Sequence, residues 1–174
     1  GEFMDSSGKS TIWIISFLAF FLFILGCQKE VGAGSMAPDF SLSDLSGHMT
    51  SIEEHRGNIV LLDFWATWCP PCRMSIPELV RLQEKYKEKG LVILGISMDD
   101  PRRVTDEYLR AFKKKIRINY TILRCNMAVI RNYFGREAPA LPTMFIINRE
   151  GRIISKLVGF RPGVLEKTLD GLFE

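Results

Sequence analysis

Apolar residues follow two different patterns along the chain. Continuous apolar runs, typical of strands buried on both faces, occupy residues 59–64, 91–97 and 143–148. Further strands are expected at 40–42, 49–51, 119–123 and 152–158, the last forming a hairpin with 143–148. Helices are predicted at 70–89, 101–114, 127–133 and 162–173, where apolar positions recur three or four residues apart. This alternation predicts an α/β fold with a central mixed β-sheet flanked by helices and an N-terminal hairpin extension.

One further apolar run, residues 11–26, is apolar on every face and precedes the first globular element. As a helix it would reach only about 24 Å, short of the ~30 Å hydrocarbon core, and its length is typical of an export signal. It ends in Ile24-Leu25-Gly26-Cys27, which resembles a bacterial lipobox, where the cysteine becomes the lipidated N-terminus. A lipoprotein lipidated at Cys27, an uncleaved membrane anchor and a released protein stay open. All three place the domain outside the cytoplasm.

The remaining chain divides into short segments and one domain. Residues 1–3, ahead of Met4, are typical of a cloning scar; residues 4–27 are the signal, lipoprotein or anchor segment. Residues 28–36 are rich in small residues and predict a flexible tether, and residues 37–174 form one folded domain. With 47% hydrophobic and 25% charged residues the chain is globular. Its net charge is only +3, and its basic residues are scattered along the chain. Nothing therefore indicates a nucleic-acid surface.

Candidate chemistry lies in Cys69-Pro70-Pro71-Cys72, directly after the predicted strand 59–64 and at the start of a predicted helix. At the N-cap, the Cys69 sulfur can accept a hydrogen bond from the Cys72 backbone N–H, and the helix N-terminus favours negative charge. Cys69 should therefore have a lowered pKa and act as the nucleophile, with Cys72 as the more buried resolving thiol. The two prolines occupy positions where a missing N–H breaks no helical hydrogen bond.

Two other interpretations of the cysteine pair are weaker. A purely structural disulfide across three residues closes almost no loop and would stabilise little. A zinc site needs two more ligands, and Cys125, His48 and His55 show no paired spacing. No metal and no cofactor is therefore expected, and the pair is interpreted as a dithiol/disulfide redox site.

Residues 37–173 resemble the thioredoxin superfamily, specifically the TlpA/ResA-like extracytoplasmic thiol–disulfide oxidoreductases with an AhpC/TSA–Redoxin-like domain. The resemblance rests on Ala37-Pro38-Asp39-Phe40, on the segment 63–73 around the cysteines, on Pro77 and on Leu141-Pro142-Thr143. It implies a thioredoxin-like fold and a redox-active Cys69–Cys72 disulfide. The substrate-binding residues that it implies are Trp68, Pro70, Pro71, Leu141, Pro142 and Thr143.

Pro142 matches the cis-proline of this family, which faces the active-site disulfide. Because a cis X–Pro bond makes a tight turn, the Leu141 backbone would be free to pair with an extended substrate segment. The alternative is an ordinary proline at the start of a strand. Trp65 and Trp68 are expected to wall the site, although either could belong to the core.

Asp63 lies six residues before Cys69, where cytoplasmic thioredoxins carry a buried acid. In an apolar strand its pKa should be raised by desolvation, so that it can accept the Cys72 proton. The alternative is an aspartate at a strand edge with a local hydrogen-bond partner. Many TlpA/ResA-like members carry glutamate where this chain has Ser75, which suggests proton handling closer to that of thioredoxin. Cys125 is interpreted as a lone buried thiol, with a regulatory thiol as the alternative.

The resemblance implies a protein-disulfide reductase, tethered to the membrane on the outer side of a bacterial cytoplasmic membrane or in the periplasm. A membrane thiol transporter of the CcdA/DsbD kind would donate electrons, and apocytochrome c is the leading substrate. Three rivals remain: a disulfide oxidase or isomerase, a peroxiredoxin-like peroxidase, and a non-enzymatic binding module. The peroxidase is disfavoured because the Pro-x-x-x-Thr-x-x-Cys setting of a peroxidatic cysteine is absent.

Overall fold

Strand β3 (Ile59–Trp65) occupies the centre of a five-stranded sheet in the computed structural model, which describes residues 33–173. The strand order is β5-β4-β3-β6-β7. β3 pairs in parallel with β4 (Leu91–Ser97), which pairs in parallel with β5 (Thr121–Arg124). On its other side β3 pairs antiparallel with β6 (Thr143–Ile147), which forms a hairpin with β7 (Ile153–Val158). The predicted mixed sheet is therefore confirmed.

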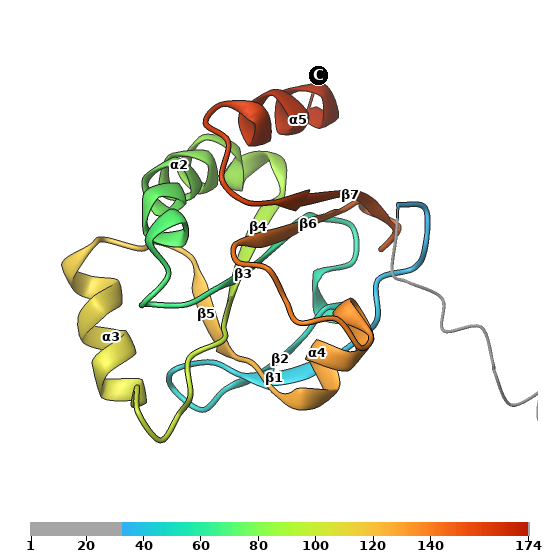
Figure 1. Cartoon of the computed structure of the whole chain (residues 1–174). Coiled ribbons are helices and arrows are strands. Elements are labelled where there is room, and N and C mark those ends of the chain that lie inside the picture. Colours follow the sequence, from blue (N-terminus) through green and yellow to red (C-terminus); the bar gives the residue numbers. More distant parts are fainter. Residues whose placement is uncertain (1–32, 174) are drawn as a thin grey trace, which may run out of the picture.

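Helices cover both faces of this sheet (Figure 1). One face carries α2 (Pro70–Tyr86), α3 (Asp106–Lys115) and α5 (Val164–Phe173). The opposite face carries α4 (Met127–Phe134) and the segment containing the hairpin of β1 (Ser41–Ser43) and β2 (Met49–Ser51). Two short 3₁₀ turns, η1 (Glu53–His55) and η2 (Lys87–Lys89), complete the elements. These elements confirm the predicted α/β layers and the N-terminal hairpin.

The core is split in two by the sheet because successive side chains of a strand point to opposite faces. Leu61 and Trp65 of β3 pack on the α2 side, whereas Leu62 and Phe64 pack on the α4 side. Both cysteines of the candidate site belong to the α2-side core. The odd-numbered positions of β3, Asp63 among them, consequently face the elements that carry the cysteine pair.

Helix α2 is fastened to α5 by a network of ion pairs. The Arg81 guanidinium donates two hydrogen bonds to the Glu166 carboxylate, at 2.7 and 2.6 Å. Lys85 Nζ lies 3.0 Å from both Glu166 Oε1 and Asp170 Oδ1. Single exposed ion pairs contribute little, but a bidentate network fixes geometry.

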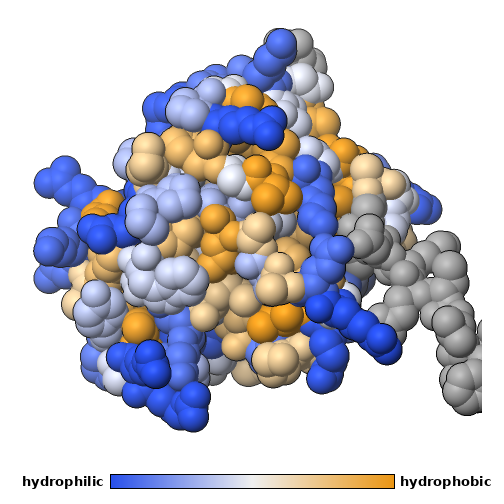
Figure 2. Space-filling view, viewed as in Figure 1, coloured by the Kyte–Doolittle hydropathy of each residue, from blue (hydrophilic) through white to orange (hydrophobic). Residues whose placement is uncertain are grey.

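In the face shown in Figure 2, hydrophilic groups crowd the periphery around a mixed, more apolar centre.

Several predicted boundaries differ from the observed ones. The helix expected from residue 101 begins at Asp106, because Thr105 is its N-cap and accepts a hydrogen bond from the Tyr108 backbone N–H. The strand expected at 119–123 is Thr121–Arg124, and the last helix begins at Val164 rather than at residue 162. The residues just before α3, β5 and α5 form turns or extended connections.

Ordered contacts also begin before the expected domain boundary at Ala37. The Gly34 N–H donates to the Ile153 carbonyl at 2.6 Å, and the Ile153 N–H donates to the Ser35 carbonyl at 2.9 Å. Met36 forms a bridge with Arg152. The end of the segment expected as a tether thus pairs with the start of β7.

The apolar run 11–26 and Cys27 lie outside the described residues. Within residues 33–173, no helix is long and apolar enough to cross a membrane.

Candidate functional site

The cysteine pair forms a disulfide at the first turn of α2. Cys69 is the N-cap, and its sulfur accepts a hydrogen bond from the Cys72 backbone N–H at 3.3 Å, as the sequence predicted. Pro70 and Pro71 occupy the first two helical positions. The exposed fractions are 3% for Cys69 and 0% for Cys72, so the residue expected to resolve the mixed disulfide is the deeper one. The helix N-terminus points its partial positive charge at the Cys69 sulfur.

The turn that presents Cys69 is held by Asp99, which sequence reasoning missed. Thr67 donates to the buried Asp99 carboxylate from its backbone N–H, at 3.1 Å, and from its hydroxyl, at 2.8 Å. The Ser97 hydroxyl donates to the same carboxylate at 3.0 Å. A usable signal was present, since an acidic residue closely follows β4 and parallel neighbours β3 and β4 end at the same sheet edge.

Asp63 lies fully buried in the middle of the central strand, paired with Gly95 of β4 and Met144 of β6. Its two carboxylate oxygens have no hydrogen-bond partner among residues 33–173. Burial raises the pKa of the Asp63 carboxyl to about 7. The alternative of an aspartate at a strand edge with a local partner therefore does not apply. At neutral pH this carboxyl can both accept and release a proton.

The Leu141–Pro142 peptide bond is cis, as the resemblance implied. Because β6 runs antiparallel to β3, the start of β6 meets the end of β3, where the disulfide follows. The Thr143 hydroxyl donates to the Ala140 carbonyl at 2.6 Å, and the Gly159 N–H donates to the Pro142 carbonyl at 2.8 Å. The loop containing Leu141 and Pro142 is thus tied to the end of β7.

The two tryptophans expected at the site, Trp65 and Trp68, have different positions. Trp65 is fully buried and stacks on Phe112 of α3, with ring centroids 5.7 Å apart, so it belongs to the core. Trp68, directly before Cys69, is 67% exposed, and Met74 of α2 is also exposed. Trp68 is therefore the tryptophan that can contact an approaching partner.

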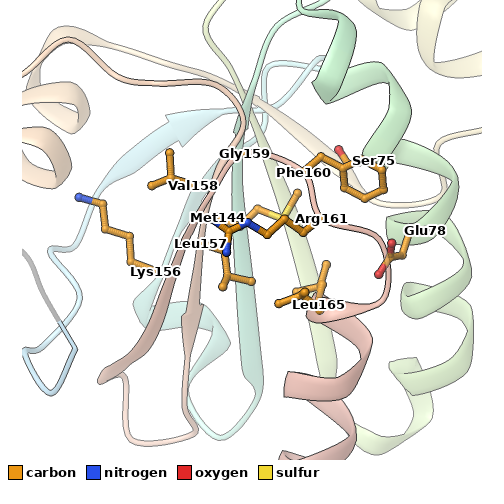
Figure 3. Close-up of a pocket in the computed structure, with 11 residues that line it drawn as sticks. Ser75, Glu78, Met144, Lys156, Leu157, Val158, Gly159, Phe160, Arg161 and Leu165 are labelled. Atoms are coloured by element: carbon orange, nitrogen blue, oxygen red, sulfur yellow. The ribbon is translucent and has the colours of Figure 1, made fainter.

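A cavity of about 250 Å³ lies between α2, the end of β7 and α5 (Figure 3). Ser75 and Glu78 of α2 line one side, Met144 and Gly159 another, and Leu165 of α5 closes it. In its wall, the Ser75 hydroxyl donates a hydrogen bond to the Cys72 carbonyl at 2.8 Å. Gly159, also in the wall, donates from its N–H to the Pro142 carbonyl. The cavity is therefore continuous with the elements that carry the disulfide and the cis-proline.

A sequence model described as "AhpC/TSA family" matches residues 33–156. The chain belongs to the AhpC/TSA family.

Individual relatives of this AhpC/TSA-family chain carry redox names. The chain is 32% identical over 155 residues to "Thioredoxin-like protein YneN" of Bacillus subtilis (strain 168), covering 88% of each chain. It is 32% identical over 132 residues to "Thiol-disulfide oxidoreductase ResA" of Geobacillus kaustophilus, covering 76% of this chain and 72% of the relative. A solved putative thiol:disulfide interchange protein DsbE from Chlorobium tepidum superposes with a TM-score of 0.72 at 30% identity, covering 83% of this chain and 100% of that chain.

Together, the disulfide, the fold and these relatives define the biochemical class. The fold is thioredoxin-like, and the protein is an oxidoreductase that works through thiols and a disulfide. The TlpA/ResA-like resemblance is confirmed at the level of the family and its ResA relatives.

The other candidate residues of this AhpC/TSA-family chain lie apart from the disulfide. Cys125 is half-buried just before Asn126, the N-cap of α4, and burial raises the pKa of its thiol to about 11. His48 follows the turn between β1 and β2, and His55 ends η1. Within residues 33–173, no three His, Cys, Asp or Glu side chains gather as a metal site would require.

Proposed function

We propose that this protein reduces disulfides in other proteins outside the cytoplasm, with Cys69 as nucleophile and Cys72 as resolving thiol. The observation that carries the proposal is the geometry of the pair: Cys69 caps α2, and Cys72 lies deeper, one turn along. The hydrogen bond from the Cys72 N–H and the helix N-terminus favour a thiolate on Cys69 once the disulfide is reduced.

The reaction has two exchange steps. The Cys69 thiolate attacks a substrate disulfide, forms a mixed disulfide and releases one substrate thiolate. Cys72 then loses its thiol proton and attacks the Cys69 sulfur, so that the Cys69–Cys72 bond forms and the second substrate thiolate leaves. Two electrons have passed from the enzyme dithiol to the substrate.

Asp63 is proposed as the acceptor of the Cys72 proton. It faces the α2-side core that contains Cys72, and its pKa of about 7 matches a group that exchanges protons near neutral pH. Substituting Asp63→Asn should slow disulfide reduction at pH 7 by about 10²-fold, within the range for general-base catalysis. The variant should remain folded, because asparagine keeps the size of the side chain. A reduction rate equal to that of the wild type would remove this role.

Substrate docking is proposed along the backbone of residues 141–143, where Leu141 is half-buried and Pro142 and Thr143 are buried, with Trp68 and the paired prolines of the α2 turn beside it. The Leu141 backbone precedes a residue without an N–H, so an extended substrate segment can pair with it. The cavity bounded by Ser75 and Gly159 lies next to this edge and is large enough for a substrate side chain.

Electron supply and location are also part of the proposal. By family resemblance a membrane thiol transporter of the CcdA/DsbD kind would regenerate the dithiol, and apocytochrome c would be the substrate. The N-terminal segment with Cys27 would tether the domain to the membrane. The direction of electron flow is measurable: a reduction potential near the ~−270 mV of thioredoxin supports a reductase, whereas one near ~−120 mV supports an oxidase.

The substrate itself can be captured. In a Cys72→Ala variant, the mixed disulfide on Cys69 cannot be resolved, so the partner stays covalently attached and mass spectrometry identifies it. The matched control is Cys69→Ala with Cys72 intact, in which capture should be lost. Both variants should carry Cys27→Ser and Cys125→Ser, so that neither cysteine outside the pair contributes adducts. Equal capture by both variants would contradict the assignment of Cys69 as nucleophile.

A further inference from the structure

Three buried polar groups on the side of the sheet that carries the disulfide have no hydrogen-bond partner within residues 33–173. They are the Asp63 carboxylate, the Trp65 indole N–H and the Tyr120 hydroxyl. The exposed fractions of these residues are 0%, 0% and 4%. Buried polar atoms are normally satisfied, so unpaired groups close together in the core require an explanation.

A glycine brings the three groups together. Asp63 is in register with Gly95 on β4, and Trp65 follows two positions along β3 on the same face. A Cβ at Gly95 would lie 3.0 Å from Trp65 Nε1 and 3.1 Å from Tyr120 Cε2. Both rings therefore cover the bare Gly95 backbone, next to Asp63. Any side chain at Gly95 would displace them.

The hydrogen-bonding capacities of these groups are complementary. The Trp65 N–H and the Tyr120 O–H can donate, and an ionised Asp63 carboxylate only accepts. A water molecule accepts two hydrogen bonds and donates two, and buried waters usually make about three. One water can thus join both donors to the carboxylate.

We propose that Tyr120 is a positioning residue for Asp63, and that its hydroxyl and Trp65 Nε1 share one buried water molecule with the Asp63 carboxylate. This inference rests on the proposed role of Asp63. The water and its two donors stabilise the ionised carboxylate, which is the form that accepts the Cys72 proton. Without them, burial alone would favour the protonated carboxyl, which cannot act as a base.

Few titratable groups face Asp63. The strand neighbours Gly95 and Met144 carry none, and α2 contributes the Cys69–Cys72 pair. The Asp63 charge contributes, after burial, to raising the pKa of Tyr120, whereas no charged side chain contributes to the shift at Asp63. Tyr120, and the two cysteines once their disulfide is reduced, are therefore the titratable groups through which this carboxyl can be tuned.

The test is Tyr120→Phe, which removes the hydroxyl and retains the ring. In the full-length oxidised protein, carbon NMR of labelled aspartate should show the pKa of Asp63 rising by about one unit, a tenfold change in proton affinity. Tyr133→Phe is the matched control, because it removes another buried hydroxyl, bonded to the Pro38 carbonyl, on the opposite face of the sheet. The control should leave the pKa of Asp63 unchanged. An unchanged or lowered pKa in Tyr120→Phe would overturn the proposal.

Kinetics separate this inference from the proposed function. The disulfide-reduction rate should rise with pH as Asp63 ionises. In Tyr120→Phe this rise should occur at a higher pH, where the proton concentration is tenfold lower. In an Asp63→Asn background, Tyr120→Phe should have no further effect on that profile. If Asp63→Asn alone leaves the rate unchanged, the catalytic role of Asp63 fails, while the NMR titration still decides the role of Tyr120.

Discussion

Replacing Asp63 with asparagine should stabilise the oxidised protein, and the gain should depend on pH in a defined direction. The carboxyl is fully buried in β3 without a partner among the described residues, so its ionised form opposes folding. In the unfolded chain the same group ionises near its ordinary pKa of 3.8. Between pH 3.8 and about 7 the folded protein holds a proton that the unfolded chain has released.

The size of the effect follows from this difference in pKa. Each pKa unit corresponds to about 1.36 kcal/mol, so a folded pKa of about 7 implies a loss of about 4 kcal/mol. The wild type has its full stability from this group below pH 3.8 and loses it progressively as the pH rises to about 7. Asparagine cannot ionise, so Asp63→Asn should gain up to about 4 kcal/mol at pH 8 relative to its effect at pH 4.

Urea unfolding of both proteins in steps between pH 4 and pH 8 measures this gain. The difference in free energy of unfolding should grow with pH up to about 7 and then level off. Glu137→Gln, an exposed carboxyl substitution, should stay within about 0.5 kcal/mol of the wild type throughout. A gain that does not vary with pH would refute the reasoning, because it would mean that Asp63 ionises alike in the folded and unfolded chains.

Three further substitutions probe other parts of the site. Trp68→Ala should change the free energy of unfolding by less than about 0.5 kcal/mol but raise KM for a protein disulfide roughly tenfold, since the ring is exposed beside Cys69; steady-state kinetics with an unchanged KM would count against a docking role. Asp99→Ala should lower the free energy of unfolding by about 2–3 kcal/mol in urea titrations, because the Thr67 N–H and hydroxyl lose their buried acceptor; a smaller loss than about 0.5 kcal/mol would contradict this anchoring. Cys125→Ser should leave the reduction rate unchanged, and in the wild type its thiol should react slowly with iodoacetamide at pH 8 because burial raises its pKa to about 11; rapid labelling of the folded protein would favour a regulatory thiol.

Local chemistry explains which features could be predicted from the sequence. The β3 run is apolar on both faces, so its central place in the sheet follows from its composition. Cys69 at the N-cap followed by two prolines predicts the start of α2 within a residue. Burial of Asp63 followed from its apolar neighbours. Each of these conclusions depends on residues within about ten positions of one another.

Features that depend on distant partners could not be predicted in this way. Thr67 finds its acceptor 32 residues along the chain, at Asp99. The Tyr120 and Trp65 rings come together because both lie over Gly95 of β4. This is a consequence of strand register rather than of local pattern. The start of α3 at Asp106, by contrast, is a local feature, set by the Thr105 cap.

The pairing of residues 34–36 with the start of β7 affects whether copies of the protein can associate through their strand edges. β7 is an edge strand, and unpaired strand edges invite other chains to add to the sheet. The N-terminal residues cover its first positions through the Met36–Arg152 bridge, and the exposed Lys156 places a charge in the middle of the remainder. At the opposite edge, Asp44 bridges Leu123 of β5. Both edges of the sheet are thereby partly covered, which disfavours edge-to-edge pairing between copies, and removal of residues 34–36 would expose the first positions of β7.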